Sequence, residues 1–452
     1  MGSIVNRLSG RLFTEPAAIF GAAILLLVII VARSPFRAVP DSLFVGDGFG
    51  YYIYLPSVVL DGDVHLANQL THQPDQPDQQ WYAYVEKTDR PGNCFQVGCA
   101  VLWSPFFLLS HAAILCLNQF GMGIRTDGFG FPYELPVYLG SFCYGLLGLR
   151  YMRQLITELY GETIATVSTF YVATTTALAA YLWFEPDMSH TPSMFLISAL
   201  FCYLSRIHKE RALDWKKWSV VGFLIGLIVS VRATDVWVLL AAVPIGIEVC
   251  GKSPGSRQQA AVCICVCALC ALFAFLPQMA AWKVLYGGYL SRPPGVYQKF
   301  DWSTPKLIEL FVGLRRGIFV WTPLLAFCMA GLVMGFFRGP RFLRYCVPVL
   351  AFALYFNSVI PKWWVGASFS ERRMVDYSVI FAVGLAHFLS LLPKPAIRKH
   401  VQLVGLPLCL FNWVLMLRYF THDLPEYGAV SAYDLIVKTF LFPVHVVWRI
   451  LN

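Results

Sequence analysis

The sequence is poor in charged residues. Asp, Glu, Lys and Arg make up 13% of its 452 residues, whereas a soluble domain typically carries about 25%. Hydrophobic residues make up 57%, and the mean hydropathy is +0.60. This composition excludes a soluble globular protein, and it leaves no long polar stretch for a separate soluble domain.

The chain also lacks an obvious cleavable signal peptide. Its first apolar run, residues 17–32, continues into Arg33, Pro35 and Arg37 without a convincing small-residue cleavage site. We therefore interpret this run as the first membrane anchor.

Similar apolar runs of about 14 to 21 residues recur along the whole chain, and with their flanks most are long enough to cross a bilayer. Every backbone amide in lipid must be paired within its own segment, so these runs should be helices. The sequence therefore predicts an all-α integral membrane protein. The clearest runs are residues 17–32, 164–183, 218–231, 260–276, 317–337, 345–360, 375–392 and 401–417.

The basic residues indicate which ends of the helices face the cytoplasm. The net charge is +9, but many Lys and Arg residues lie in short loops between spans, so we expect no nucleic-acid partner. Short basic loops mark the cytoplasmic side. These loops contain Arg7, Arg11, Arg150, Arg153, Arg206, Lys209, Arg211, Lys216, Lys217, Lys252, Arg257, Arg338, Arg341, Arg344, Lys394, Arg398 and Lys399.

With these loops inside, residues 1–452 form a single transmembrane domain. The chain alternates across the plasma (inner) membrane in about eleven spans, and its N-terminus is cytoplasmic. Three longer segments then face the outer side. They are the first outer loop, residues 41–132, a second long loop, residues 283–316, and a C-terminal tail, residues 421–452.

One apolar stretch, residues 98–117, does not fit the alternation as a full span. A crossing there would move the basic pair Arg150 and Arg153 to the outer side. The stretch also contains Trp103 and His111, which suit a lipid-facing span poorly. We therefore expect an interfacial or re-entrant helix on the outer face.

Cysteine is informative at one place only. Most of the thirteen cysteines lie in predicted spans, where a free thiol packs as a small apolar group. Cys94 and Cys99 lie in the first outer loop, and they could form a disulfide in an oxidising compartment. The sequence leaves this open.

The unusual polar residues concentrate in the predicted outer segments. Asp47 lies between glycines, just before a segment in which Tyr51 and Tyr52 suit a membrane–water interface. The glycines allow a substrate to approach closely. A carboxylate at this place either acts on a substrate or only caps the helix, and spacing does not separate the two.

Two further acids in this loop are candidate ligands for a divalent cation. Asp61 and Asp63 are separated by one glycine. Carboxylate oxygens bind such ions, but this pattern more often forms a turn. Nearby, Asn93 follows a charged stretch that is either a solvated loop or part of a site between membrane-hugging segments.

A second acidic group lies at the outer end of two later spans. Glu185, Asp187 and His190 fall within six residues and suit an acid–base or metal site, or a polar turn capped by Ser189. Arg232 with Asp235 marks another outer turn. An ionisable pair at this depth is a functional candidate, although it can also simply neutralise itself.

Positive charge on the outer side runs against the topological rule and indicates an anionic ligand such as a phosphate. Tryptophan beside arginine also suits a sugar, although Trp363 and Trp364 could serve as interfacial anchors alone. The residues concerned are Lys362, Trp363, Trp364, Arg372 and Arg373, together with the loop that contains Arg292, Lys299, Lys306, Arg315 and Arg316.

Taken in order, these elements resemble the GT-C superfamily of membrane glycosyltransferases, which includes protein O-mannosyltransferases and the aminoarabinose transferases of lipid A. Each motif is short, but their order and spacing from the first span to the tenth are more specific. The motifs are residues 47–52 (DGFGYY), 55–63 (LPSVVLDGD), 98–106 (GCAVLWSPF), 189–190 (SH), 315–323 (RRGIFVWTP) and 363–369 (WWVGASF).

The resemblance implies an enzyme that moves a hexose or pentose from a polyprenyl-phosphate donor to a glycan, lipid or protein hydroxyl, with inversion. It implies that Asp47 is the catalytic base, although the family often has an Asp-Glu pair where this chain has Gly48. The resemblance identifies no certain cofactor, and a divalent cation stays open.

Within this scheme the outer side chains fall into two groups. The donor phosphate would bind Arg372 and Arg373 first, then Arg232 and Lys362. The sugar and acceptor would meet Tyr51, Tyr52, Trp363, Trp364, His190, Glu185, Asp187 and Asn93.

Two other classes of protein fit parts of the pattern. A transporter or flippase of an anionic lipid would place charges inside discontinuous spans and often shows related halves. The sequence has no internal repeat, and most spans are free of charge. A scaffold that binds lipid would keep the basic loops but would not need Asp47. The glycosyltransferase interpretation accounts for more of the residues.

Overall fold

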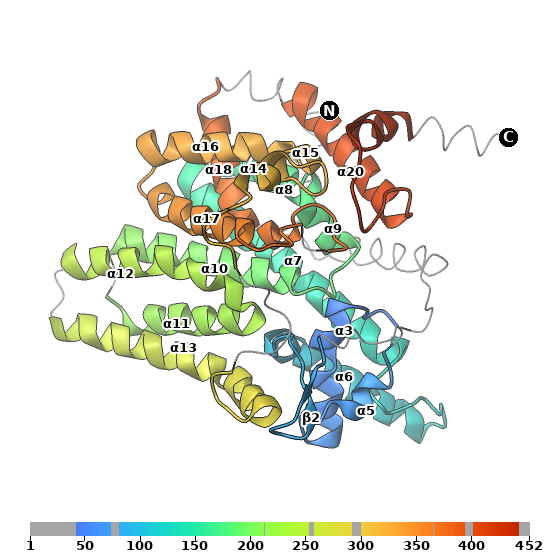
Figure 1. Cartoon of the computed structure of the whole chain (residues 1–452). Helices are drawn as coiled ribbons and strands as arrows, with labels where there is room; N and C mark the ends of the chain where they lie inside the picture. Colours follow the sequence, from blue (N-terminus) through green and yellow to red (C-terminus); the bar gives the residue numbers. More distant parts are fainter. Residues whose placement is uncertain are drawn as a thin grey trace.

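The computed structural model describes residues 42–73, 81–211, 213–252, 257–291, 300–364, 366–393 and 401–442. The predicted first span, residues 17–32, lies outside the described residues, as do Arg292 and Lys299. The described chain is mostly helical, which confirms the predicted class (Figure 1). One antiparallel pair, β1 (Tyr84–Val85) with β2 (Arg90–Pro91), forms a small hairpin.

Long helices make up the body of the molecule, and short helices lie at the ends of these long ones. The long helices are α6 (Gly98–Gln119), α7 (Phe131–Tyr160), α8 (Glu162–Thr174), α10 (His190–Glu210), α11 (Trp215–Val231), α12 (Leu239–Lys252), α13 (Arg257–Tyr286), α16 (Leu324–Arg338), α17 (Leu343–Ser358), α18 (Ser378–Ser390) and α20 (Leu406–Phe420). The short ones are α3 (Asp47–Tyr52), α4 (Tyr54–Pro56), η2 (Ser57–Asp61), α5 (Ala67–Leu70), α9 (Ala177–Trp183), η3 (Ala233–Val238), α14 (Leu307–Val312), α15 (Ile318–Trp321), η4 (Arg372–Tyr377), η5 (Val401–Gly405) and η6 (Tyr433–Val437).

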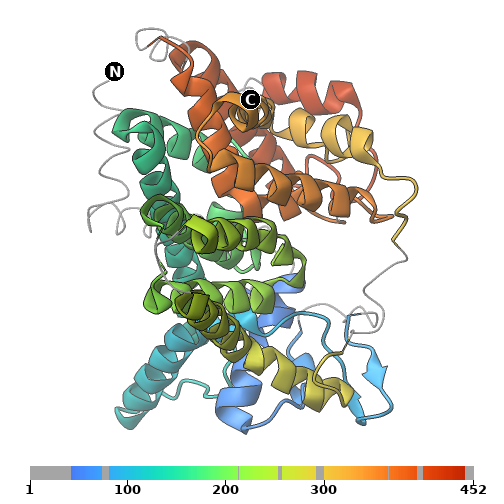
Figure 2. The same cartoon turned by 90° about the vertical axis from the view of Figure 1, so that its left-hand side faces the viewer.

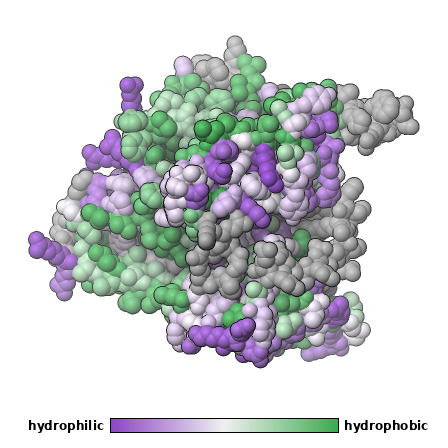
Figure 3. All heavy atoms as spheres, in the orientation of Figure 1, coloured by the Kyte–Doolittle hydropathy of each residue, from purple (hydrophilic) through white to green (hydrophobic). Residues whose placement is uncertain are grey.

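The helices form two groups on either side of α10. In Figures 1 and 2, α16, α17, α18 and α20 lie on one side of α10, and α11, α13 and the residues of the first outer loop lie on the other. Hydrophobic residues cover much of the surface in Figure 3, including the region of α12 and α13. On α13, Ile264 and Phe273 are exposed. An apolar exterior of this kind suits a lipid environment.

Four helices in the described part are long and apolar enough to cross a membrane, or five if the bent pair α8 and α9 is one span. The four are Gly98–Gln119, Ala233–Gly251, Arg257–Tyr286 and Leu403–Phe420. Other predicted runs form shorter helices, such as α17 with 16 residues and α18 with 13. The total of about eleven spans stays a prediction.

Two predicted continuous spans are broken. Residues 164–183 form α8 and α9, whose axes differ by 72°. Between them Thr176 is extended, and its hydroxyl accepts from Leu178 N at 3.2 Å, so it competes with helical pairing. Residues 317–337 are interrupted before Pro323, because proline disfavours helical geometry in the residue before it.

The predicted interfacial stretch is one continuous helix, α6. It begins against the end of α11, where a Cβ added to Gly98 would lie 2.3 Å from the Ser230 carbonyl carbon. It then runs antiparallel to the first half of α7, since Ser110 contacts the Pro132 carbonyl at 2.5 Å and Tyr144 contacts the Leu102 carbonyl at 2.8 Å. Its start therefore lies at the end of α11 and not beside that helix.

Side-chain contacts group the loops at two ends of the bundle. At one end, Arg206 pairs with Glu158 at 2.7 Å, and Glu248 lies 3.4 Å from His208 and 4.0 Å from Arg341. These residues belong to or adjoin loops predicted to be cytoplasmic. The loops predicted to be external meet at the other end, which we call the predicted outer end.

Close helix packing depends on glycine. On α11, a Cβ at Gly222 would lie 2.0 Å from the Cys267 carbonyl oxygen, and one at Gly226 would lie 2.2 Å from that of Ala271. The spacing of four residues puts both glycines on the face that meets α13. Small residues at this spacing let two membrane helices approach closely.

We expect Gly222→Ala to destabilise the protein, because its methyl group has no space against the α13 backbone. The cost should be about 1–3 kcal/mol, visible as a lower melting temperature of the detergent-purified protein. Gly251→Ala is the matched control, since nothing lies within 4 Å of its added Cβ. Equal melting temperatures for the two variants would contradict the packing argument.

Candidate functional site at the predicted outer end

The segment that carries Asp47 is fixed by its neighbours. Glu134 on α7 accepts from Leu43 N at 2.5 Å and from Ser42 Oγ at 3.1 Å, which holds the chain just before α3. Gly46 has a φ of 54°, a conformation that suits glycine, and Asp47 follows as the first residue of α3. Glu134 was not recognised from the sequence.

Two predicted sugar-site residues help to hold α3. Asn93 donates from Nδ2 to the Gly50 carbonyl at 2.8 Å, and Tyr52 donates to the Gly128 carbonyl at 2.6 Å. Both side chains are buried. The structure therefore uses these polar groups to position Asp47.

Asp47 forms an ion pair with Arg372. Arg372 Nη2 donates to Asp47 Oδ2 at 2.7 Å, and the two side chains are 14% and 20% exposed. The residues lie 325 positions apart in the sequence. The fold thus brings the predicted base and the first predicted phosphate-binding residue into direct contact.

Asp187 supplies a carboxylate beside Gly48, the residue that follows Asp47. It is buried, and a Cβ on Gly48 would lie only 2.5 Å from its Oδ2 atom. Any side chain at position 48 would therefore displace Asp187. The family resemblance favours an acid at position 48, and in this chain the loop between α9 and α10 places one against the glycine there instead.

A second charged network is built around Arg232. Arg232 Nε lies 2.8 Å from Asp376 Oδ2, and Asp376 Oδ1 lies 2.7 Å from His190 Nδ1. Arg232 Nη1 also donates to Ser189 Oγ at 2.9 Å, and that hydroxyl lies 3.0 Å from the Tyr51 hydroxyl. The network therefore connects α3, α10, the end of α11 and η4.

The predicted pairing of Arg232 with Asp235 is only secondary. Their closest nitrogen–oxygen distance is 3.9 Å, longer than the 2.8 Å contact with Asp376. Asp235 instead accepts from Ser193 at 2.5 Å and from Tyr377 at 3.0 Å. Asp376 was not singled out from the sequence, because it follows the basic motif in a run that reads as apolar.

The remaining predicted binding residues differ in their surroundings. Arg373 donates to Asn357 Oδ1 at 3.0 Å, and Trp363 is buried. The Arg315 guanidinium stacks on the ring of Trp364, 3.9 Å from the ring centre. Lys362 is exposed.

Glu185 lies close enough to affect its neighbours electrostatically. Burial lowers the pKa of Arg372, but the carboxylates of Asp47 and, to a smaller extent, Glu185 outweigh it, and that pKa is raised above its usual range.

Asp61 and Asp63 have the bonding of a turn. Asp61 accepts from Asn68 at 2.9 Å and also from Gln69, whereas Asp63 accepts from His65 N at 2.9 Å. Among the described residues, no three His, Cys, Asp or Glu side chains come together in a way that could hold a metal ion. Cys94 and Cys99, which also belong to the first outer loop, are both free, and no disulfide joins them in the structure.

Glu371 is a buried acid that sequence reasoning passed over. No side chain in the described part of the chain hydrogen-bonds to either carboxyl oxygen. Burial raises the pKa of this carboxyl to about 7, against the opposing effect of the Arg373 and Arg372 charges and of the Arg373 backbone N–H. Its position directly before two arginines was the available signal.

Arg316 ties the C-terminal tail to the predicted outer end. It is buried, lies over the rings of Trp321 (4.5 Å) and Tyr419 (5.2 Å), and donates to the Glu426 carbonyl at 2.9 Å. The described part of the predicted outer tail, residues 421–442, is therefore attached beside the site.

The fold and site define a helical protein with an apolar exterior, whose loops converge at one end on acids and arginines. Residues 120–282 match the family of dolichyl-phosphate-mannose-protein mannosyltransferases. The matched range is less than half of the chain. No curated protein sequence matches.

Solved structures give the fold. ArnT from Cupriavidus metallidurans, in a structure bound to undecaprenyl phosphate, is 13% identical with a TM-score of 0.55, over 97% of this chain and 72% of that one. AglB, an oligosaccharyltransferase from Archaeoglobus fulgidus, is 13% identical with a TM-score of 0.43, over 95% and 54%. The chain thus spans about half of the archaeal enzyme's length. The predicted resemblance to the GT-C superfamily is confirmed, and the chain has the GT-C fold.

We expect the stability of the protein to depend on Glu371 and on pH. The folded pKa of about 7 exceeds the unfolded value of about 4.3, so folding retains a proton between these values. Stability is therefore full below the unfolded pKa and is lost as pH rises to about 7, by up to about 3 kcal/mol. Glu371→Gln should remove this loss.

Melting temperatures of the wild type and Glu371→Gln, measured from pH 5 to pH 8 in detergent, test this expectation. The variant should gain on the wild type as pH rises. A difference between them that does not change with pH would contradict it.

Proposed function

We propose that this protein is a membrane glycosyltransferase that moves a sugar from a polyprenyl-phosphate donor to an acceptor hydroxyl at the predicted outer end. The observation that carries the proposal is the contact between Asp47 and Arg372. It places a carboxylate able to accept a proton beside a guanidinium able to bind a phosphate. A transfer from a lipid phosphate needs both groups close together.

Donor binding would change the partner of Arg372. A phosphate oxygen is a strong ligand for arginine, and two parallel hydrogen bonds can form. As Arg372 turns toward the phosphate, the Asp47 carboxylate is released to contact the acceptor hydroxyl. The ion pair thus holds both groups in place until the donor arrives.

The chemical step then follows from these positions. Asp47 removes the proton from the acceptor hydroxyl while the oxygen of that hydroxyl attacks the anomeric carbon. The bond from that carbon to the phosphate oxygen breaks, and polyprenyl phosphate leaves with the electron pair. Arg372 and Arg373 stabilise the charge that develops on the phosphate. Attack opposite the leaving phosphate inverts the anomeric centre.

The Arg232 network has a positioning role in this proposal. Arg232 is held by Asp376 and Ser189, and Ser189 contacts Tyr51 on the helix that Asp47 begins. His190 is buried against Asp376, which suits it to orient that acid. Tyr51 and Trp364 remain the aromatic candidates to contact a sugar.

The lipid nature of the donor rests on the fold. ArnT, which shares this fold, was solved with undecaprenyl phosphate bound. Here Arg372 can bind the phosphate of such a donor, and Asp47 lies next to it to contact the acceptor. The plasma-membrane location, the cytoplasmic N-terminus and the outer-face site belong to the same proposal.

We expect Asp47→Asn to abolish turnover and to leave donor binding intact, because asparagine keeps the shape and cannot act as a base. The transfer rate should fall by about 10²- to 10⁴-fold. The assay is sugar transfer in proteoliposomes with a panel of polyprenyl-phosphate sugars. Asp61→Asn, in an exposed turn, is the matched control.

The outcomes of this assay separate the alternatives. Equal transfer by wild type and Asp47→Asn would reduce Asp47 to a helix cap. Absence of transfer by the wild type from any donor would favour a transporter or a lipid-binding scaffold.

We expect Arg372→Gln to weaken donor binding, because glutamine keeps polar contacts but removes the positive charge. The affinity for polyprenyl phosphate should fall by about 10-fold or more, which corresponds to a charged hydrogen bond of about 1.5–3 kcal/mol. Arg125→Gln is the matched control, since Arg125 lies in the first outer loop and its side chain is 71% exposed. The same loss in both variants would show that the effect is general surface charge.

A further inference from the structure

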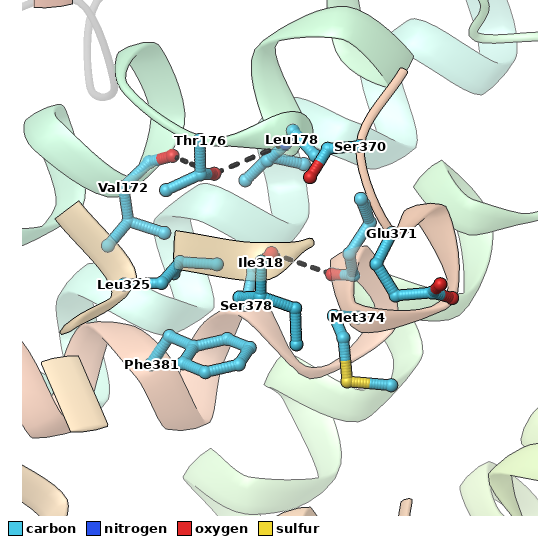
Figure 4. A pocket seen from close by; sticks show the side chains of 12 residues that line it. Val172, Thr176, Leu178, Ile318, Leu325, Ser370, Glu371, Met374, Ser378 and Phe381 are labelled. Carbon is cyan, nitrogen blue, oxygen red and sulfur yellow. Dashed lines mark hydrogen bonds between the residues drawn. The ribbon is translucent and has the colours of Figure 1, made fainter. Parts of the chain in front are cut away.

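Glu371 lies beside a small internal cavity of about 10 Å³, which is close to the room needed by one water molecule. Figure 4 shows its carboxyl group turned away from the apolar side chains of Ile318, Leu325 and Phe381. Both carboxyl oxygens are buried, and no side chain in the described part of the chain hydrogen-bonds to them. A carboxylate in such a place is costly unless it is protonated or lies near positive charge.

Positive charge is present, but it is committed elsewhere. Arg372 donates to Asp47, and Arg373 donates to Asn357. Arg373, Arg372 and the more distant Arg232 therefore favour the charged form of Glu371 through space. The charge state of Glu371 therefore depends on the net charge at these arginines, although its carboxyl group is not the partner of their hydrogen bonds given above.

Among the described residues that line the cavity, Glu371 is the only titratable one. The side chains that line it from α8, α9, α15, α16 and α18 are apolar or hydroxyl groups. The helices α9, α10, α17 and α18 pack against η4. They carry titratable groups of their own, among them Tyr181, His190, Tyr355 and His387, and none of these lines the cavity. Asp376, on η4 itself, is paired with Arg232 and His190.

We infer that Glu371 is a proton-binding site coupled to anion binding at Arg372 and Arg373: it takes up a proton when a phosphate anion binds these arginines and releases it when the anion leaves. This inference rests on the proposed function, which assigns the donor phosphate to the two arginines. The physical reason is that a bound anion cancels the positive potential that keeps Glu371 charged.

Coupling of this kind makes anion affinity depend on pH. Because binding and proton uptake are linked, affinity should fall as pH rises above neutrality, by up to about tenfold per pH unit. The range is near neutral because burial raises the pKa of Glu371 to about 7. A sugar phosphodiester keeps one negative charge over this pH range, so any change of its affinity with pH would come from a titrating group of the protein.

Calorimetry with farnesyl methyl phosphate, a phosphodiester with one charge that does not titrate here, tests the coupling. The full chain in detergent is titrated at pH 7.5 in two buffers of different ionisation enthalpy, and the difference in heat gives the protons taken up. We expect about 0.5 to 1 proton per bound anion. We also expect affinity at pH 6.5 to exceed that at pH 8.5 by about tenfold.

Two variants assign the proton to Glu371. Glu371→Gln should bind the probe with no proton uptake and with an affinity that does not change with pH. Glu371→Asp, which keeps a carboxyl group, should retain the uptake and guards against a folding defect in the first variant.

The failures are distinguishable. Binding by the wild type without proton uptake, or equal uptake in Glu371→Gln, overturns the inference and leaves the proposed function standing. Absence of binding by the wild type overturns both, because the arginines then hold no phosphate.

Discussion

At the predicted outer end, two partly buried arginines are paired with carboxylates, and this pairing organises that part of the molecule. Arg372 is matched by Asp47, and Arg232 by Asp376. Removing a charge from water is costly, so each pair forms only if the elements that carry its members are brought together. The first outer loop, the ends of α10 and α11, and η4 are therefore drawn to one place by electrostatics as well as by packing.

The same pairing links structure to chemistry. The Asp47–Arg372 pair is a structural contact, but both members have stronger partners in a reacting complex. A phosphate competes for the guanidinium, and an acceptor hydroxyl needs the carboxylate. Glu371 is different, since it is buried with no side-chain partner in the described part of the chain, and in our proposal its proton depends on what the arginines bind. Acids in three environments thus surround one cluster of arginines.

Much of the fold could be predicted because lipid imposes simple rules on sequence. Apolar runs such as residues 218–231 and 260–276 fall within α11 and α13. The rules failed where side chains compete with the backbone, as at Thr176, or where proline interrupts a helix, as at Pro323. They also could not show that Asn93 and Tyr52 are used to hold α3, because a polar residue in a loop looks the same in either role.

The sequence by itself determined the class of protein, the helices and the outer candidates Asp47, Arg372 and Arg232. These follow from composition, run length and charge position, which are local properties. Only the tertiary structure decided which candidates meet. Asp187 lies against Gly48, the residue after Asp47, because glycine leaves room for it, and Asp376 becomes the partner of Arg232 through the packing of η4. Contacts between residues hundreds of positions apart depend on how helices pack, and no local pattern contains that information.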